Sequence, residues 1–130
     1  MNRLRPIILA GALWVALLAP ALAGAQELAV LTASSRTISV AKGSYVLIEL
    51  AANPTTGYSW STKGFSRAGV AQVLGSDYVP PTSHLLGAGG TCFYLLKALG
   101  TGTTTLTLAY ARSFDSGGAT TQRFVITVTP

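Results

Sequence analysis

Residues 45–60, YVLIELAANPTTGYSW, decide the fold of this chain. The aliphatic residues at positions 46, 48 and 50 fall on one side of an extended chain, because successive side chains of a strand point to opposite faces. The pair Asn53-Pro54 then begins a turn that ends at Gly57. A second strand candidate follows and carries Trp60, which we expect to anchor the core. A strand, a tight turn and another strand indicate an all-β domain.

The rest of the chain repeats this pattern. The other strand candidates are 28–32, 37–40, 58–62, 70–74, 92–98, 105–110 and 123–128. Turn-forming residues separate them, and we interpret the Pro/Gly-rich stretch from Asp77 to Gly90 as a long loop. No segment has helical spacing with caps. Short strands with regular turns predict one domain, either a sandwich or a small barrel.

The first 25 residues have the features of a secretory signal peptide. Two arginines precede an apolar run over 7–22, and Ala23-Gly24-Ala25 fits the small-x-small pattern of a cleavage site. A membrane anchor of about 20 apolar residues is the competing interpretation, but a proline and several small residues in the run favour cleavage. We therefore expect a signal peptide at 1–25, a mature domain at 26–130 and a periplasmic or secreted protein.

The distribution of charge argues against a nucleic-acid partner. Without the two arginines of the signal segment, the nine basic residues fall to seven against four acidic ones, so the mature domain has a net charge of +3. These residues are scattered and form no basic stripe with interleaved aromatics. We expect no nucleic-acid partner, no membrane contact after signal cleavage, and a monomer.

Catalytic groups are scarce in this sequence. His84 is the single histidine and Cys92 the single cysteine, so no intramolecular disulfide can form. A small hydrolase that uses this pair as base and nucleophile is an alternative that requires the two side chains to meet. The four acidic residues show no paired spacing, and four ligands for a structural zinc cannot be assembled. We expect no enzyme activity, no metal and no cofactor.

The turn at 53–57, called the tip turn below, is suited to binding. Pro54 fixes its own φ and moves Asn53 away from helical angles, while Gly57 permits a positive φ at the exit. The Asn53 side chain can hydrogen-bond loop backbone, and two threonines stand at the tip. Such restriction lowers the ordering entropy that binding would otherwise cost.

Two further segments have features of binding loops. The glycine segment, 87–90 (Gly-Ala-Gly-Gly), permits close approach of a partner to the backbone, or serves only as a tight connection. The third segment, 112–114 (Arg-Ser-Phe), ends a strong strand and places an aromatic ring near an arginine, a combination enriched at binding hot spots. An aromatic ring folded back on the core is the alternative for this segment.

In this order and at these spacings, the three segments resemble the loop set of the chagasin-type inhibitors of cysteine peptidases. The tip turn with Tyr58 matches the family's Asn-Pro-Thr-Thr-Gly-aromatic motif at every position, and the glycine segment matches Gly-x-Gly-Gly. The resemblance extends over 28–129. The third segment departs, because Ser113 stands where the family usually has proline, and Phe114 offers a smaller face than tryptophan. We therefore expect a working inhibitor whose third segment is less rigid than in the family.

The resemblance implies an immunoglobulin-like β-sandwich that inhibits papain-like cysteine peptidases reversibly and tightly. The two threonines would lie against the catalytic Cys–His pair, and the other two segments would brace the sides of the cleft. The alternative is an immunoglobulin-like periplasmic interaction module that binds an envelope protein or a glycan through the same face. The peptidase-binding residues implied by the resemblance are Asn53, Pro54, Thr55, Thr56, Gly57, Tyr58, Gly87, Ala88, Gly89, Gly90, Arg112, Ser113 and Phe114.

Overall fold

The computed structural model describes residues 28–82, 87–113 and 118–130. In these ranges it contains eight strands and one 3₁₀ turn, η3 (Pro54–Thr56). The strands are β1 (Leu28–Thr32), β2 (Thr37–Ala41), β3 (Tyr45–Ala52), β4 (Tyr58–Phe65), β5 (Ala71–Val79), β6 (Gly90–Ala98), β7 (Gly102–Arg112) and β8 (Thr120–Thr129). No helix in these ranges is long and apolar enough to cross a bilayer.

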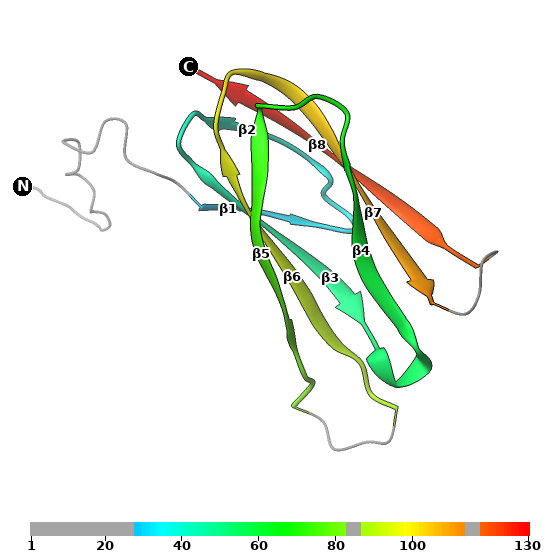
Figure 1. The fold of residues 1–130 in the computed structure, drawn as a ribbon. Helices are drawn as coiled ribbons and strands as arrows, with labels where there is room; N and C mark the ends of the chain where they lie inside the picture. The colour runs from blue at the N-terminus through cyan, green and yellow to red at the C-terminus, as the bar shows by residue number, and fades with distance from the viewer. Residues whose placement is uncertain (1–27, 83–86, 114–117) are drawn as a thin grey trace, which may run out of the picture.

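The strands form two four-stranded sheets that pack face to face (Figure 1). The first sheet has the order β1-β3-β6-β5 and the second the order β2-β8-β7-β4. The pairs β1–β3 and β2–β8 are parallel, and the other neighbouring strands are antiparallel. This arrangement confirms the predicted immunoglobulin-like β-sandwich. The barrel alternative is wrong, because the strands separate into two sheets.

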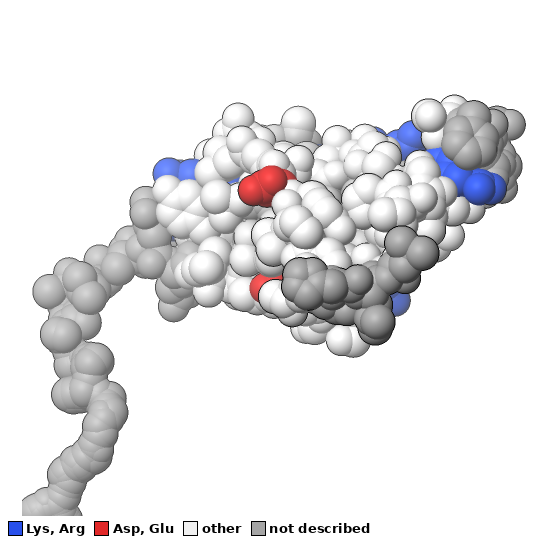
Figure 2. Space-filling model, turned by 90° about the horizontal axis from the view of Figure 1, so that it is seen from below, with Lys and Arg blue, Asp and Glu red and all other residues white. Residues whose placement is uncertain are grey.

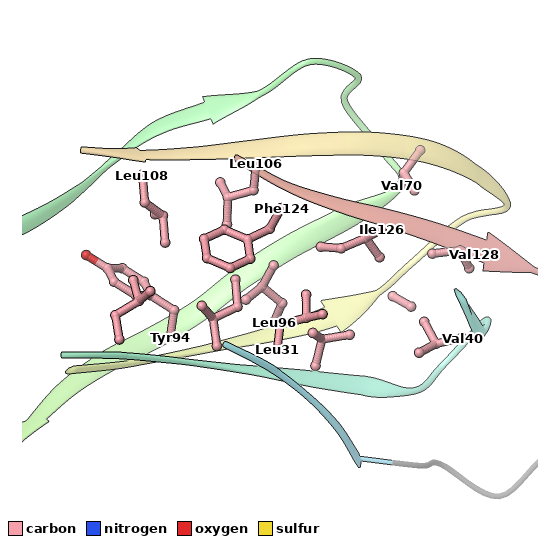
Figure 3. Close-up of a cluster of buried hydrophobic side chains, with 14 residues drawn as sticks. Leu31, Val40, Val70, Tyr94, Leu96, Leu106, Leu108, Phe124, Ile126 and Val128 are labelled. Carbon is pink, nitrogen blue, oxygen red and sulfur yellow. The ribbon is translucent and has the colours of Figure 1, made fainter. Parts of the chain in front are cut away.

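Side chains from both sheets meet in the core between them (Figure 3). The alternation predicted for β3 is confirmed, since Val46, Ile48 and Leu50 are buried while the residues between and beside them are half-buried or exposed. Trp60 is half-buried and packs against the core from β4. The other buried core residues are Leu31, Val40, Val70, Tyr94, Leu96, Ala98, Leu106, Leu108, Phe124, Ile126 and Val128. Burial of each large apolar side chain stabilises the folded state by about 1.5–3 kcal/mol. This burial stabilises the domain in the absence of a disulfide, which a single cysteine cannot form.

One stretch predicted as loop is a strand. Residues 77–79 belong to β5 and pair with β6, so the interpretation of 77–90 as a loop is wrong for its first three residues and for Gly90. β5 lies at the edge of its sheet, where only one side of the backbone needs a partner, and a register shift between Val73 and Gly75 interrupts its pairing with β6. The proline pair at 80–81 then ends the strand.

The strand register brings the three predicted binding segments to one end of the sandwich, called the loop end below. Ala52 at the end of β3 pairs with Gly90 at the start of β6. Tyr58 at the start of β4 pairs with Arg112 at the end of β7. The β3–β4, β5–β6 and β7–β8 connections therefore leave the same end, whereas β1 begins and β8 ends toward the opposite end (Figure 1).

Candidate functional site

The tip turn is closed by hydrogen bonds among its own residues. Asn53 caps the 3₁₀ turn, because its Oδ1 accepts from the backbone N–H of Thr55 at 3.3 Å and from the Thr55 hydroxyl at 2.5 Å. Its carbonyl oxygen accepts from the N–H and the hydroxyl of Thr56, at 3.1 and 2.7 Å. Gly57 has a φ of +85°, and its N–H donates to the Pro54 carbonyl at 2.9 Å. The asparagine cap and the positive φ predicted from the sequence are both confirmed.

Asn53 also joins the tip turn to two neighbours. Its side-chain Nδ2 donates to the carbonyl oxygen of Gly87 at 2.7 Å, which ties the tip turn to the glycine segment. Its backbone N–H donates to the hydroxyl of Tyr110 at 3.0 Å. Since Asn53 follows β3 and Tyr110 lies on β7, this second bond connects the two sheets.

The glycine segment lies against the base of the tip turn, and its last two glycines have no room for a side chain. A Cβ on Gly89 would lie 3.0 Å from the carbonyl oxygen of Ala52. A Cβ on Gly90 would lie only 2.2 Å from the carbonyl oxygen of Val79. Gly87 has a φ of +80°, which residues with a Cβ rarely adopt. These glycines satisfy packing within the domain, and this packing brings the segment beside the tip turn.

Aromatic rings fill the inner face of the second sheet at the loop end. The Tyr110 ring stacks on Tyr58 with centroids 5.1 Å apart and planes 21° apart, and it packs on Trp60 at 4.8 Å. The Trp60 indole N–H donates to the carbonyl oxygen of Ala51 at 3.0 Å. These stacked and tilted ring contacts stabilise the base of the tip turn beyond the area that they bury.

The third segment is described only in part. Arg112 ends β7, and its guanidinium carbon lies 4.8 Å from the centroid of the Tyr58 ring, a cation–π contact. Ser113 follows in an exposed turn. Phe114 lies outside the described residues, so its binding role stays a prediction. The contact between Arg112 and Tyr58 nevertheless connects this segment to the residue that directly follows the tip turn.

The structure thus brings the described candidates together and adds two residues that the sequence analysis did not assign to the site. The tip turn contacts the glycine segment through Asn53, and Tyr58, the residue directly after the turn, contacts Arg112 of the third segment. The added residues are Tyr110 and its neighbour Trp60. Alternation along β7 contained a signal, since position 110 follows the buried positions 106 and 108 on the inward face.

Charge is sparse at the loop end. Residues 53–58 and 87–90 contain no charged side chain, and Arg112 is the single charge in 112–114. Figure 2, seen from below, shows a mostly uncharged surface with acidic and basic side chains in small, separate patches. The loop end therefore offers a partner polar and aromatic groups, and little charge for electrostatic steering.

Cys92 lacks the features of a nucleophile. Burial raises the pKa of the Cys92 thiol, and the nearby Asp77 carboxylate raises it further, so the reactive thiolate is disfavoured. His84, the partner that a hydrolase would need, lies outside the described residues. Within the described ranges, no group of three or more His, Cys, Asp or Glu residues could hold a metal ion.

Sequence comparisons agree on one family. The family model described as chagasin family peptidase inhibitor I42 matches residues 39–128. Chagasin from Trypanosoma cruzi is 34% identical over an alignment of 93 residues, and the alignment covers 69% of this chain and 84% of chagasin.

Two solved structures share the fold. The cysteine protease inhibitor EhICP2 from Entamoeba histolytica aligns with a TM-score of 0.67 at 22% identity, over 81% of this chain and 98% of that one. PbICP-C, solved in complex with falcipain-2, aligns with a TM-score of 0.58 at 21% identity, over 80% and 91% of the two chains. At these identities the two structures support the sandwich fold alone.

Gly90→Ala tests whether the glycine segment needs its close packing. The added Cβ would overlap the carbonyl oxygen of Val79, so β5 and β6 would have to separate. We expect the free energy of unfolding, measured by urea denaturation, to fall by about 1–3 kcal/mol.

Gly75→Ala is the matched control, because Gly75 lies in β5 of the same sheet and no atom lies within 4 Å of its added Cβ. We expect this variant to change the free energy of unfolding by less than about 0.5 kcal/mol. Equal stability of the two variants would contradict the proposed packing requirement.

Proposed function

The chain belongs to the chagasin family of peptidase inhibitors, and we propose that its loop end binds and blocks the active-site cleft of a papain-like cysteine peptidase. It is an inhibitor of cysteine peptidases and not an enzyme. The observation that carries the proposal for the loop end is the set of hydrogen bonds on Asn53, which presents two exposed threonines on a fixed turn. The alternative of a general interaction module would require the tip-turn motif to resemble the family by chance. The family match explains the motif, so this alternative loses its support.

Occlusion of a nucleophile needs no chemistry from the inhibitor. A tip that keeps its shape and enough buried surface suffices, and complexes of this kind bury about 1,600 Å² in total. Thr55 and Thr56 are exposed at the end of the turn and would cover the catalytic Cys–His pair. Binding that rests on such contacts is reversible, because no covalent bond forms.

The tip turn also has a geometry that resists cleavage. A scissile carbonyl must reach the nucleophile and the oxyanion site in near-attack geometry. In the tip turn the carbonyl of Asn53 accepts hydrogen bonds from Thr56, and the carbonyl of Pro54 accepts one from Gly57. Both carbonyl oxygens are engaged within the turn. The inhibitor would therefore cover the catalytic pair without offering these bonds for cleavage.

The other two segments would widen the contact on either side of the tip. The glycine segment would run along one wall of the cleft, with Gly87 held beside Asn53. Arg112 and Phe114 would brace the other wall, and the ring would pack against aromatic side chains of the peptidase. Since one chain carries all three segments, a monomer is sufficient for inhibition.

We further propose that the protein acts outside the cytoplasm, in the periplasm or after secretion. The support lies in residues 1–25, where a basic start, an apolar run and a small-x-small sequence follow one another. Cleavage after Ala25 would leave 26–130 as the mature inhibitor.

Replacement of Thr55 and Thr56 together by alanine tests the tip. The double variant loses two side chains that would fill the centre of the interface and two hydrogen bonds within the turn. We expect the inhibition constant for papain, measured by titration of its activity, to rise about 100-fold or more, as for central hot-spot residues.

Two comparisons sharpen this test. The double variant with Thr103→Ala and Thr127→Ala removes two paired hydroxyls, 3.1 Å apart, at the other end of the sandwich and should inhibit like the wild type. Serine at both Thr55 and Thr56 keeps the hydroxyls, so any remaining loss measures contacts of the methyl groups. Unchanged inhibition by the tip alanine variant would refute the role of the tip.

Ser113→Pro tests the proposed softness of the third segment. Proline would restrict φ where the family usually has this residue, so less order would have to be imposed in the complex. We expect dissociation from papain to slow about two- to fivefold, measured by recovery of activity after dilution. Ser113→Ala removes the hydroxyl without restricting φ and should dissociate like the wild type. Equal dissociation of the proline variant and the wild type would count against a soft third segment.

Expression of the full chain in a bacterial host tests the export proposal. We expect the protein in the periplasm or the medium, with an intact mass that begins at residue 26. Arginine at both Ala23 and Ala25 should block cleavage, because a signal peptidase site needs small residues there. A wild-type protein that stays in the membrane fraction with its N-terminus intact would establish the anchor interpretation instead.

A further inference from the structure

Tyr110 lies outside the three segments but contacts the residues that organise them. Its hydroxyl accepts the backbone N–H of Asn53 at 3.0 Å. Its ring packs on Tyr58 at 5.1 Å and on Trp60 at 4.8 Å. It belongs to β7 of the second sheet, whereas Asn53 follows β3 of the first. One side chain thus spans the sandwich where the core ends and the loops begin.

The position of Tyr110 along β7 explains why a tyrosine suits it. Leu106 and Leu108 precede it on the same inward face and are fully buried, so aliphatic side chains suffice there. Tyr110 is half-buried, because the sandwich opens at the loop end. A residue with an apolar ring and a polar tip can pack against its neighbours and still offer an acceptor to the adjacent loop.

The bond from Tyr110 fixes the residue on which the tip turn depends. The side-chain amide of Asn53 makes two further hydrogen bonds in different directions, between Oδ1 and Thr55 and between Nδ2 and Gly87. The amide can make both bonds at once only while the backbone of Asn53 keeps its position. The hydroxyl of Tyr110 holds the backbone N–H, and the ring holds the strand on which the turn ends.

We propose that Tyr110 is a positioning residue of the inhibitor, which acts through Asn53 and keeps the tip turn in its binding shape before a peptidase arrives. Without the hydroxyl, the free protein samples other tip shapes, and only the competent fraction can bind. The apparent dissociation constant then rises in inverse proportion to that fraction. Since the peptidase selects the competent shape, the loss falls on the association rate constant.

Tyr110→Phe is the decisive variant, because it removes one hydroxyl and keeps the ring. We expect the association rate constant with papain to fall about three- to tenfold, the range for one intramolecular hydrogen bond, and the dissociation rate constant to change less than about twofold. We also expect hydrogen exchange of the Asn53 amide, followed by NMR in the free protein, to accelerate about tenfold or more, since its acceptor is gone. A loss of global stability alone would not produce this pattern.

Tyr45→Phe is the matched control, because Tyr45 begins β3 at the far end, where its ring lies 5.3 Å from the Lys97 ammonium nitrogen. It should leave the rate constants and the Asn53 amide unchanged. The inference is overturned if Tyr110→Phe leaves the exchange of the Asn53 amide unchanged, or if the affinity loss lies in dissociation. The kinetic part rests on the proposed function, whereas the exchange measurement needs no peptidase. A wild type that fails to inhibit papain would therefore count against the function, and the role of Tyr110 would be decided by exchange alone.

Discussion

The hydrogen bond from the Asn53 N–H to the Tyr110 hydroxyl is the constraint on which the rest of the loop end depends. It joins a loop of one sheet to a strand of the other, at the point where the core no longer fixes the backbone. With that N–H held, the Asn53 side chain can cap the tip turn and reach Gly87 together. Three of the polar groups of one residue therefore organise two loops, at the cost of ordering a single short side chain.

The core and the register supply the rigid base for this arrangement. Apolar burial between the two sheets stabilises the domain without a disulfide, and the register places Tyr58 opposite Arg112 and Ala52 opposite Gly90. The loops thus start from strand ends whose relative positions are fixed by many ladder hydrogen bonds. Preorganisation of the tip begins in the sheets, and the turn residues only complete it.

Local chemistry explains which features the sequence could predict. The strands followed from a period of two, and the shape of the tip turn followed from an asparagine, a proline and a glycine within five positions. The contacts that the sequence left open are those between distant positions: Asn53 and Tyr110 are 57 positions apart, and Asn53 and Gly87 are 34 apart. The end of β5 was missed for a similar reason, since an edge strand tolerates glycine and nearby proline that a central strand would not.

Because the loop end carries little charge, the rate of association depends on the rigidity of the tip turn. Electrostatic steering can raise association far above the neutral range of about 10⁵–10⁷ M⁻¹s⁻¹, but the tip turn and the glycine segment carry no charge with which to steer. Without steering, an encounter between inhibitor and peptidase leads to binding only if the tip turn already has its binding shape. The association rate is then the neutral rate multiplied by the competent fraction. Because no steering compensates for a low competent fraction, a side chain that holds the tip, as we propose for Tyr110, keeps the association rate close to the neutral rate.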